Sequence, residues 1–314
     1  MDTMLTITWP LFGIILIGYS ACRFNLLNQA EARGVHGFVY YFALPALLCV
    51  KVSEMPLSQW LHWPIMGAYY GAGSLVFVIA LVLGRLWFHQ RPAIVGLQGV
   101  AAIYPNVGYI GLPLVLTIFG DSGTAPAVLF FVCDNLVGMI LATTLLEADQ
   151  PHRGRWREVG RKVGVGILRN PMIGAVWVGG MCAALGWELP ASVATLGGLL
   201  GAAATPGALF ALGISLASVA RPTTERIGEV ALPVVLKLIV HPALVWLVVT
   251  YLVSVGPIWR AVAIIEAILP TGLQIFVMAQ KYDIAVELTS TTVLVATVFS
   301  ILTVSIVVGV VAPF

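Results

Sequence analysis

Charged residues are scarce in this 314-residue chain, in which Asp, Glu, Lys and Arg together make up 10% of the sequence. An ordinary soluble domain carries about 25% charged residues. Hydrophobic residues make up 60% of the chain, and its mean hydropathy is +0.99. This composition excludes a water-soluble surface, so the protein is expected to span a membrane. The formal net charge of +2 gives no indication of a nucleic-acid partner.

Motifs for redox, nucleotide or proteolytic chemistry are also missing. The cysteines Cys22, Cys49, Cys133 and Cys182 lie in or at the ends of apolar runs without a CxxC spacing, so we expect buried free thiols. No nucleotide-binding motif is present, which excludes primary transport by this chain alone. An intramembrane aspartyl protease needs two facing aspartates, and only Asp134 lies clearly inside an apolar run. GAGSL and LGISL do not fit a serine-protease elbow. We therefore expect neither an enzyme nor a bound cofactor.

Long apolar runs separated by short charged loops fill the rest of the chain. A helical span needs about 20 residues, because the hydrocarbon core is about 30 Å thick. No basic segment precedes the first run, so this run is expected to be a span and not a signal peptide. We predict an all-α polytopic protein with ten transmembrane helices at 6–22, 34–51, 64–88, 93–118, 124–147, 171–187, 191–218, 229–254, 258–281 and 287–312.

The basic residues test this count through their distribution between the two sides. With both termini outside the cytoplasm, only Lys51 and Arg260 fall on the outer side, and Lys237 lies within a span. The loop 148–170 is the basic cytoplasmic loop between two halves. This asymmetry follows the positive-inside rule. The thirteen inner basic residues are Arg23, Arg33, Arg85, Arg91, Arg153, Arg155, Arg157, Arg161, Lys162, Arg169, Arg221, Arg226 and Lys281.

The two halves, 1–147 and 171–314, show a weak internal repeat. At an offset of 165, Pro105 in IYPNVGYIGLP aligns with Pro270 in LPTGLQIFVMA. At a nearby offset, Pro45 aligns with Pro206. Because each half holds five predicted spans, an odd number, the second half is expected to lie inverted relative to the first. Such inverted repeats are common in secondary transporters.

Prolines and glycines interrupt the fourth and ninth predicted spans. Pro105 is followed by Gly108, and Pro270 is followed by Gly272. Proline lacks an N–H group and clashes with the preceding turn, so both helices are expected to be discontinuous. A break exposes backbone polar groups, which are tolerated in a membrane where they line a cavity. Two breaks at equivalent depth are therefore expected to form a binding site near the bilayer midplane, where half-helix N termini favour an anion.

Three segments give the chain a resemblance to a known family. YPNVGYIGLPL, LKLIVHPALVW and LPTGLQIFVMAQKYD are similar to segments of the auxin efflux carrier family, which includes bacterial members. The family belongs with the bile acid–sodium symporter superfamily. The resemblance implies a scaffold (panel) domain from spans 1, 2, 6 and 7, and a core (transport) domain from spans 3–5 and 8–10. It also implies broken helices that cross, elevator-like motion, and organic-anion cargo such as auxin, malonate or malate.

Uncharged polar and aromatic residues surround the two predicted breaks. Asn106, Thr271 and Gln274 suit a carboxylate or a sodium ion, although helix capping would also explain them. The aromatic side chains are as consistent with packing as with walling the site. The predicted substrate-binding residues are Tyr104, Pro105, Asn106, Gly108, Tyr109, Pro270, Thr271, Gly272 and Gln274.

Ionisable residues inside predicted spans are candidates for ion coupling. Asp134, beside Asn135, needs a partner or a proton, and Lys237 is predicted to pair with it. Lys237 and His241 are four residues apart and share one helix face. Snorkelling of Lys237 and ordinary packing of His241 are the structural alternatives. Glu266 lies one turn before the second break, where it either binds a coupling ion or lines a cavity.

The coupling mechanism stays open at this point. The superfamily resemblance suggests sodium at Glu266, Gln274 and Asn106, whereas a proton on Asp134, His241 or Glu266, or uniport, fits equally well. We predict a secondary transporter of a small organic anion, multi-pass in a bacterial inner membrane, with a channel or receptor-like sensor as the alternative. Small residues at 197–213 allow close helix approach, within the scaffold or in a homodimer.

Overall fold

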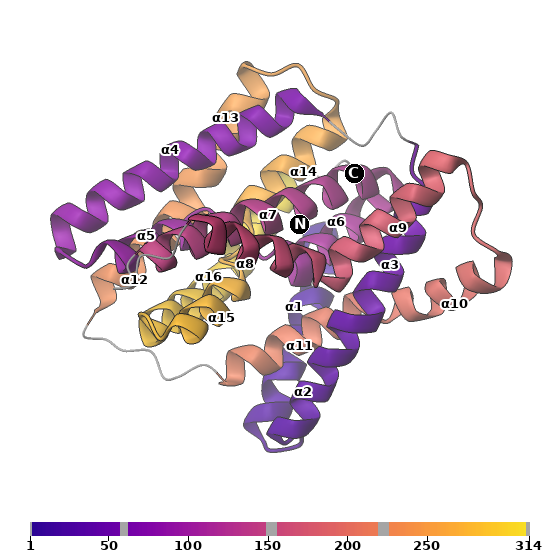
Figure 1. Cartoon of the computed structure of the whole chain (residues 1–314), viewed down its shortest axis with the longest axis horizontal. Helices are drawn as coiled ribbons and strands as arrows, with labels where there is room; N and C mark the ends of the chain where they lie inside the picture. The colour runs from indigo at the N-terminus through magenta and orange to yellow at the C-terminus, as the bar shows by residue number, and fades with distance from the viewer. Residues whose placement is uncertain (1, 57–61, 149–155, 219–225, 312–314) are drawn as a thin grey trace. The chain divides into compact units, whose positions relative to one another are not determined.

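The computed structural model describes residues 2–56, 62–148, 156–218 and 226–311 (Figure 1). All regular structure in these ranges is helical, and none of it is β-strand. Within these ranges, six helical runs are long and apolar enough to cross a membrane: Ala30–Ser53, Trp63–Phe88, Val107–Glu147, Ala191–Ala217, Ile227–Tyr251 and Val286–Val311. The protein is therefore an all-α multi-pass membrane protein, as expected. The ten-span count, the inverted repeat and the orientation of the termini stay predictions, and Arg153, Arg155 and Arg221 lie outside the described residues.

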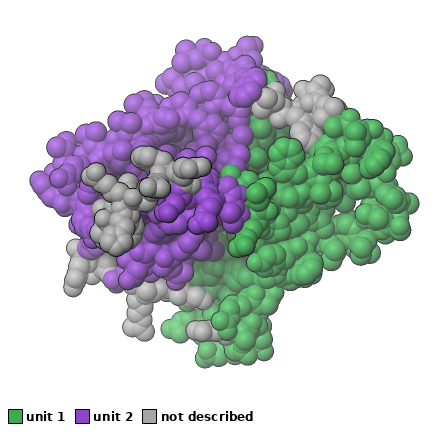
Figure 2. Space-filling view, viewed as in Figure 1, with its two compact units in different colours: residues 1–62, 108–132, 166–218 green, residues 63–107, 133–165, 219–314 purple. Residues whose placement is uncertain are grey.

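The chain forms two compact units, each assembled from three separate stretches of sequence (Figure 2). Unit 1 comprises residues 1–62, 108–132 and 166–218, and unit 2 comprises residues 63–107, 133–165 and 219–314. The chain passes from unit 2 to unit 1 within predicted span 4, and it passes back to unit 2 within predicted span 5. The division into scaffold and core domains stays a prediction.

Unit 1 is a set of closely packed apolar helices. Its helices and turns are α1 (Asp2–Arg23), α2 (Gln29–Phe38), η1 (Val39–Ala43), α3 (Leu44–Ser53), most of η3 (Val107–Gly111), α6 (Leu112–Phe119), η4 (Gly120–Gly123), the start of α7 (Thr124–Ala148), α9 (Pro171–Leu185), α10 (Ala191–Ala202) and α11 (Ala204–Ser218). α1 packs along α11, and α3 packs against α9 and α10.

Glycine explains how closely α1 and α11 approach. A Cβ added at Gly213 would lie 2.0 Å from the carbonyl oxygen of Ile15, and one at Gly18 would lie 2.2 Å from that of Phe210. Real Cβ atoms do not approach backbone oxygens so closely, so each helix needs its glycine where the other helix crosses it. Small residues that let helix backbones meet are a general device of membrane interiors.

Unit 2 contains the remaining helices and both helix breaks. Its elements are α4 (Trp63–Phe88), α5 (Pro92–Ala101), the rest of α7, most of α8 (Trp156–Leu168), α12 (Ile227–Val235), η5 (Leu236–Val240), α13 (His241–Tyr251), α14 (Pro257–Ile268), α15 (Leu273–Tyr282) and α16 (Val286–Val311). α4 lies beside α5 and α13, and α16 packs against α12, α14 and α15.

Prolines determine where three wide π-helical turns occur. The turns η1, η3 and η5 each end two residues before a proline, at Pro45, Pro113 and Pro242. Proline removes one backbone donor and pushes away the preceding turn. A π-helical turn accommodates both effects without ending the helix. Pro105 and Pro270 behave differently, because both lie at real helix ends.

Candidate functional site

Two helices of unit 2 stop in the interior of the protein at the prolines that the sequence singles out. α5 ends at Ala101, four residues before Pro105, and α14 ends at Ile268, two residues before Pro270. Both prolines are buried. In a continuous helix, each carbonyl accepts a hydrogen bond from the N–H four residues later. The breaks therefore leave carbonyls near the end of each half-helix without that partner.

A short antiparallel bridge joins the two breaks. Pro105 pairs with Thr271 in an isolated bridge. The N–H of Asn106 donates to the carbonyl of Pro270 at 2.9 Å, and the N–H of Gly272 donates to the carbonyl of Tyr104 at 3.0 Å. The bridge satisfies backbone groups that the breaks release, and burial would make such groups expensive to leave unpaired.

A side chain from the opposite break caps α5. The Thr271 hydroxyl, which is fully buried, donates to the carbonyl of Ala101 at 2.8 Å. In an unbroken helix this carbonyl would pair with the nitrogen of Pro105, which carries no hydrogen. Thr271 therefore supplies the hydrogen bond that Pro105 is unable to donate, and part of its role is the helix capping considered from the sequence.

A buried lysine caps α14. Nζ of Lys237, from η5, donates to the carbonyl of Ala267 at 2.6 Å, and the side chain is completely buried. The regular helical partner of that carbonyl would be Thr271, which lies beyond the end of α14. A positive charge is favourable at a helix C terminus because of the helix dipole. Lys237 does not snorkel to the surface, and it stabilises the broken end of α14.

The other charged candidates lie buried in the same unit. Asp134 is 3% exposed, and its Oδ1 accepts a hydrogen bond from the Tyr70 hydroxyl at 2.8 Å. His241 and Glu266 are completely buried. Within the described residues, both carboxylate oxygens of Glu266 lack a hydrogen-bond partner. Asn135 is half-buried beside Asp134 on α7.

The direct ion pair predicted between Asp134 and Lys237 is not formed in the described part of the chain. Each group has another hydrogen-bond partner: Tyr70 for the carboxylate and the Ala267 carbonyl for the ammonium. Lys237 also lies 3.5 Å from Nδ1 of His241, as their spacing on one helix face predicts.

Tyr104 fits into a narrow space beside the bridge. A Cβ at Gly272 would lie 2.6 Å from its ring, and one at Gly138 would lie 2.1 Å from it. The Tyr104 hydroxyl donates to Oε1 of Gln274 at 3.3 Å. Gln274 is exposed, whereas Asn106 is 3% exposed. Only residues without a Cβ leave room for this ring, so both glycines position Tyr104.

Two of the predicted substrate-binding residues, Gly108 and Tyr109, belong to unit 1. The ring of Tyr109 lies edge-on to that of His36, with centroids 6.3 Å apart, and Nε2 of His36 lies 2.9 Å from the Ser215 hydroxyl. The structure brings the other seven predicted residues together in unit 2. His36, Ser215 and Tyr70 were not predicted. His36 did carry the signal used for the ion-coupling candidates, an ionisable side chain inside a predicted span, whereas Ser215 and Tyr70 carry no such signal.

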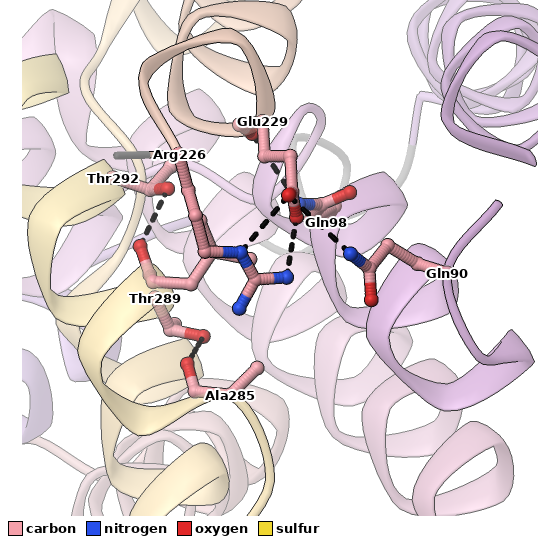
Figure 3. Close-up of polar contacts among 8 residues, drawn as sticks. Gln90, Gln98, Arg226, Glu229, Ala285, Thr289 and Thr292 are labelled. Atoms are coloured by element: carbon pink, nitrogen blue, oxygen red, sulfur yellow. Dashed lines mark hydrogen bonds and ion pairs between the residues drawn. The ribbon is translucent and has the colours of Figure 1, made fainter. Parts of the chain in front are cut away.

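A second polar network joins the first turn of α12 to α5 (Figure 3). The Arg226 guanidinium donates to both carboxylate oxygens of Glu229, at 2.9 and 2.6 Å. This hydrogen-bonded carboxylate raises the pKa of Arg226. Gln90 donates to the same carboxylate, and Gln98 donates to the Glu229 carbonyl, both at 3.3 Å. The network links α12 to Gln98 within α5 and to Gln90, which precedes α5.

The described residues contain no group of three or more His, Cys, Asp and Glu side chains able to hold a metal ion. The family relationship is clear from comparison with known proteins. A family model described as "Membrane transport protein" matches residues 3–308. The chain belongs to this family.

Two named relatives match nearly the whole chain, and a third matches about half of it. A Rhizobium meliloti protein called "Putative malonate transporter" is 32% identical over 297 residues, covering 94% of this chain and 92% of its own. "Auxin efflux carrier component 8" of Arabidopsis thaliana is 25% identical over 338 residues, with 91% of each chain covered. The mouse "Lysosomal cholesterol signaling protein" is 29% identical over 182 residues, which are 54% of this chain and 20% of that protein. The protein is therefore a membrane transporter of this family, and the resemblance seen in the sequence is confirmed.

Proposed function

We propose that the protein is a secondary transporter of a small organic anion, and that its cargo binds where the two broken helices meet. The observation that carries this proposal is the bridge between Pro105 and Thr271, with both half-helices ending inside the protein. Non-helical backbone inside a membrane protein is tolerated where it lines a cavity or is buried in protein. A mono- or dicarboxylate, such as malonate, malate or an auxin-like acid, is consistent with the names of the relatives.

The start of α15 provides donors of the kind that an anion needs. No side chain caps this helix at Gly272, so its first N–H groups have no side-chain acceptor there. A helix N terminus with open N–H groups favours a carboxylate through hydrogen bonds and through the helix dipole. Asn106 and Thr271 lie in the bridge immediately before it. We place the carboxylate of the cargo at this point.

The wider mechanism in this proposal is elevator-type alternating access by two inverted five-helix repeats. A core domain of spans 3–5 and 8–10 would carry the cargo against a scaffold of spans 1, 2, 6 and 7. Glu266, Asp134 and His241 are the candidates for coupling to sodium or protons. The protein would lie in a bacterial inner membrane, as a homodimer, with both termini outside the cytoplasm.

A receptor-like sensor on a transporter fold is the alternative. One observation favours it: a relative that matches 54% of this chain is named as a signaling protein. Saturable uptake of labelled anion into liposomes would support the carrier. Specific anion binding without any transport would support the sensor.

The test is uptake by proteoliposomes that contain the purified protein. Labelled malonate, malate and indole-3-acetate would be supplied under imposed sodium or proton gradients. Gly272→Ala is expected to lower uptake at least tenfold, because its Cβ would lie 2.6 Å from the Tyr104 ring and 2.9 Å from the Pro105 carbonyl. The double variant Pro270→Ala, Gly272→Ala is expected to insert normally and to lose transport.

Gly71→Ala, in α4 of the same unit, is the matched control, because a Cβ at that position meets no neighbouring atom within 4 Å. Its uptake is expected to equal that of the wild type. Full uptake by the Gly272→Ala protein would remove the broken helices from the cargo site.

A further inference from the structure

A cavity of about 290 Å³ lies within unit 2, among residues of α4, α5, α7 and α13. Its walls are mainly apolar and include Phe77, Val100 and Leu141. Tyr104, which takes part in the bridge, also borders it. The volume is near the lower end of small-molecule pockets, which run from about 300 to 1,000 Å³. The cavity therefore suits a small organic group.

Asp134 gives this cavity an open hydrogen-bond acceptor. One carboxylate oxygen accepts from Tyr70, and the other, Oδ2, is buried without a partner among the described residues. The side chain lines the cavity and is 3% exposed. A buried acceptor without a donor is unfavourable, so a donor brought by a ligand or by water would be bound there.

His241 gives the cavity a second open acceptor. Its Nδ1 lies 3.5 Å from Nζ of Lys237, and its ring forms a hydrogen bond with the Ala267 backbone. Nε2 has no partner among the described residues, so Nδ1 carries the ring proton and donates to the Ala267 carbonyl. Nε2 is therefore an acceptor, and it lies buried 3.6 Å from where a Cβ on Gly73 would be. The polar end of the cavity thus offers two acceptors.

We propose that this cavity is a subsite for the organic end of the cargo, in which Asp134 and His241 select an uncharged group that donates a hydrogen bond, such as a hydroxyl. A hydroxyl would donate to Oδ2 of Asp134 or to Nε2 of His241. A second carboxylate would instead meet the Asp134 carboxylate, and a plain hydrocarbon would leave both polar atoms unpaired. The inference rests on the proposed carrier function, because the carboxylate of the cargo is placed at the broken helices.

Three acids that differ at one end test this subsite. They are 4-hydroxyphenylacetate, phenylacetate and 4-carboxyphenylacetate. The affinity of each is measured by calorimetry on the intact protein in lipid nanodiscs. The hydroxy acid is expected to bind about tenfold more tightly than either of the others. Equal affinities, tightest binding by the dicarboxylate, or no binding by any acid would overturn the proposal and leave a cavity that holds water only.

Matched variants test whether Asp134 causes the preference for the hydroxy acid. Asp134→Asn keeps the shape of the side chain but replaces the open acceptor with a donor. The affinity for 4-carboxyphenylacetate is therefore expected to rise about tenfold relative to that for the hydroxy acid. Asp283→Asn, an exposed carboxylate in the same unit, is expected to change nothing. Val137→Phe narrows the cavity, so it is expected to weaken the binding of all three acids. This variant tests the subsite if the Asp134 variant does not fold.

Uptake separates this inference from the proposed function. The predicted order of binding without transport of any acid would support the subsite and overturn the carrier. Transport of malonate without the predicted order of binding would support the carrier and overturn the subsite.

Discussion

In unit 1 glycines let helix backbones touch, whereas unit 2 encloses buried acidic and basic residues. Every buried Asp, Glu, Lys, Arg or His side chain in the described ranges lies in unit 2: Asp134, Glu147, Glu229, Lys237, His241 and Glu266. In unit 1 the two closest glycine contacts are with backbone atoms of another helix, as between Gly213 and the Ile15 carbonyl. Glycine lets helices pack closely but provides no reactive or charged group. A buried charge costs free energy in a membrane and is typically retained there for function. The contrast indicates that chemistry is concentrated in unit 2.

The largest effect is expected from removing the buried cation of unit 2. Lys237→Met keeps the volume of the side chain but leaves the Ala267 carbonyl without its cap and Asp134 and Glu266 without a nearby positive charge. Breaking a buried charged network typically costs about 3–5 kcal/mol. Thermal unfolding in detergent should show a large fall in melting temperature. A melting temperature equal to that of the wild type would mean that Lys237 does not stabilise the break.

A smaller effect is expected from crowding the glycine contact of unit 1. Gly213→Ala places a methyl group where the Ile15 carbonyl lies, and overpacking of this kind costs about 1–3 kcal/mol. The melting temperature measures it. Gly198→Ala in α10 is the control, because no atom lies within 4 Å of its added Cβ, and a neutral or stabilising change is expected. Equal behaviour of the two variants would contradict the packing argument.

A similar or smaller loss is expected at the bridge. Thr271→Val removes the hydroxyl that caps Ala101 and leaves a buried carbonyl unpaired, at about 1–2 kcal/mol. Thr271→Ser should restore most of the melting temperature and the uptake, because serine supplies the same donor. If valine and serine behave alike, the hydroxyl does not cap α5.

The smallest effect is expected at the exposed ion pair of unit 1. Lys51 pairs with Asp121, whose side chain is 86% exposed. Exposed pairs contribute little, because water and salt screen them. Lys51→Met should therefore leave the melting temperature almost unchanged, and it is the matched control for Lys237→Met. A fall as large as that of the Lys237 variant would show that burial does not decide the difference.

The sequence was sufficient to predict the helix breaks, since Pro105 and Pro270 are local signals of a missing donor. It was also sufficient to predict an all-α membrane protein. The caps were not predictable, because Thr271 and Ala101 are 170 residues apart and meet only in the folded protein. For Lys237, the prediction considered acidic partners and missed the Ala267 carbonyl, which is available only because α14 stops. Broken helices create backbone acceptors that a search for opposite charges overlooks.

Both capping side chains belong to the second half of the chain, so the two halves depend on each other to different degrees. Lys237 and the carbonyl that it caps both belong to the second half, whereas the Ala101 carbonyl of the first half is capped by Thr271 of the second. If the chain were cut between residues 148 and 170, the second fragment would keep the cap of its own broken helix. In the first fragment, the Ala101 carbonyl would have no cap until this fragment associated with the second. Assembly of the two halves would then be led by the second, with α5 completed only on their association.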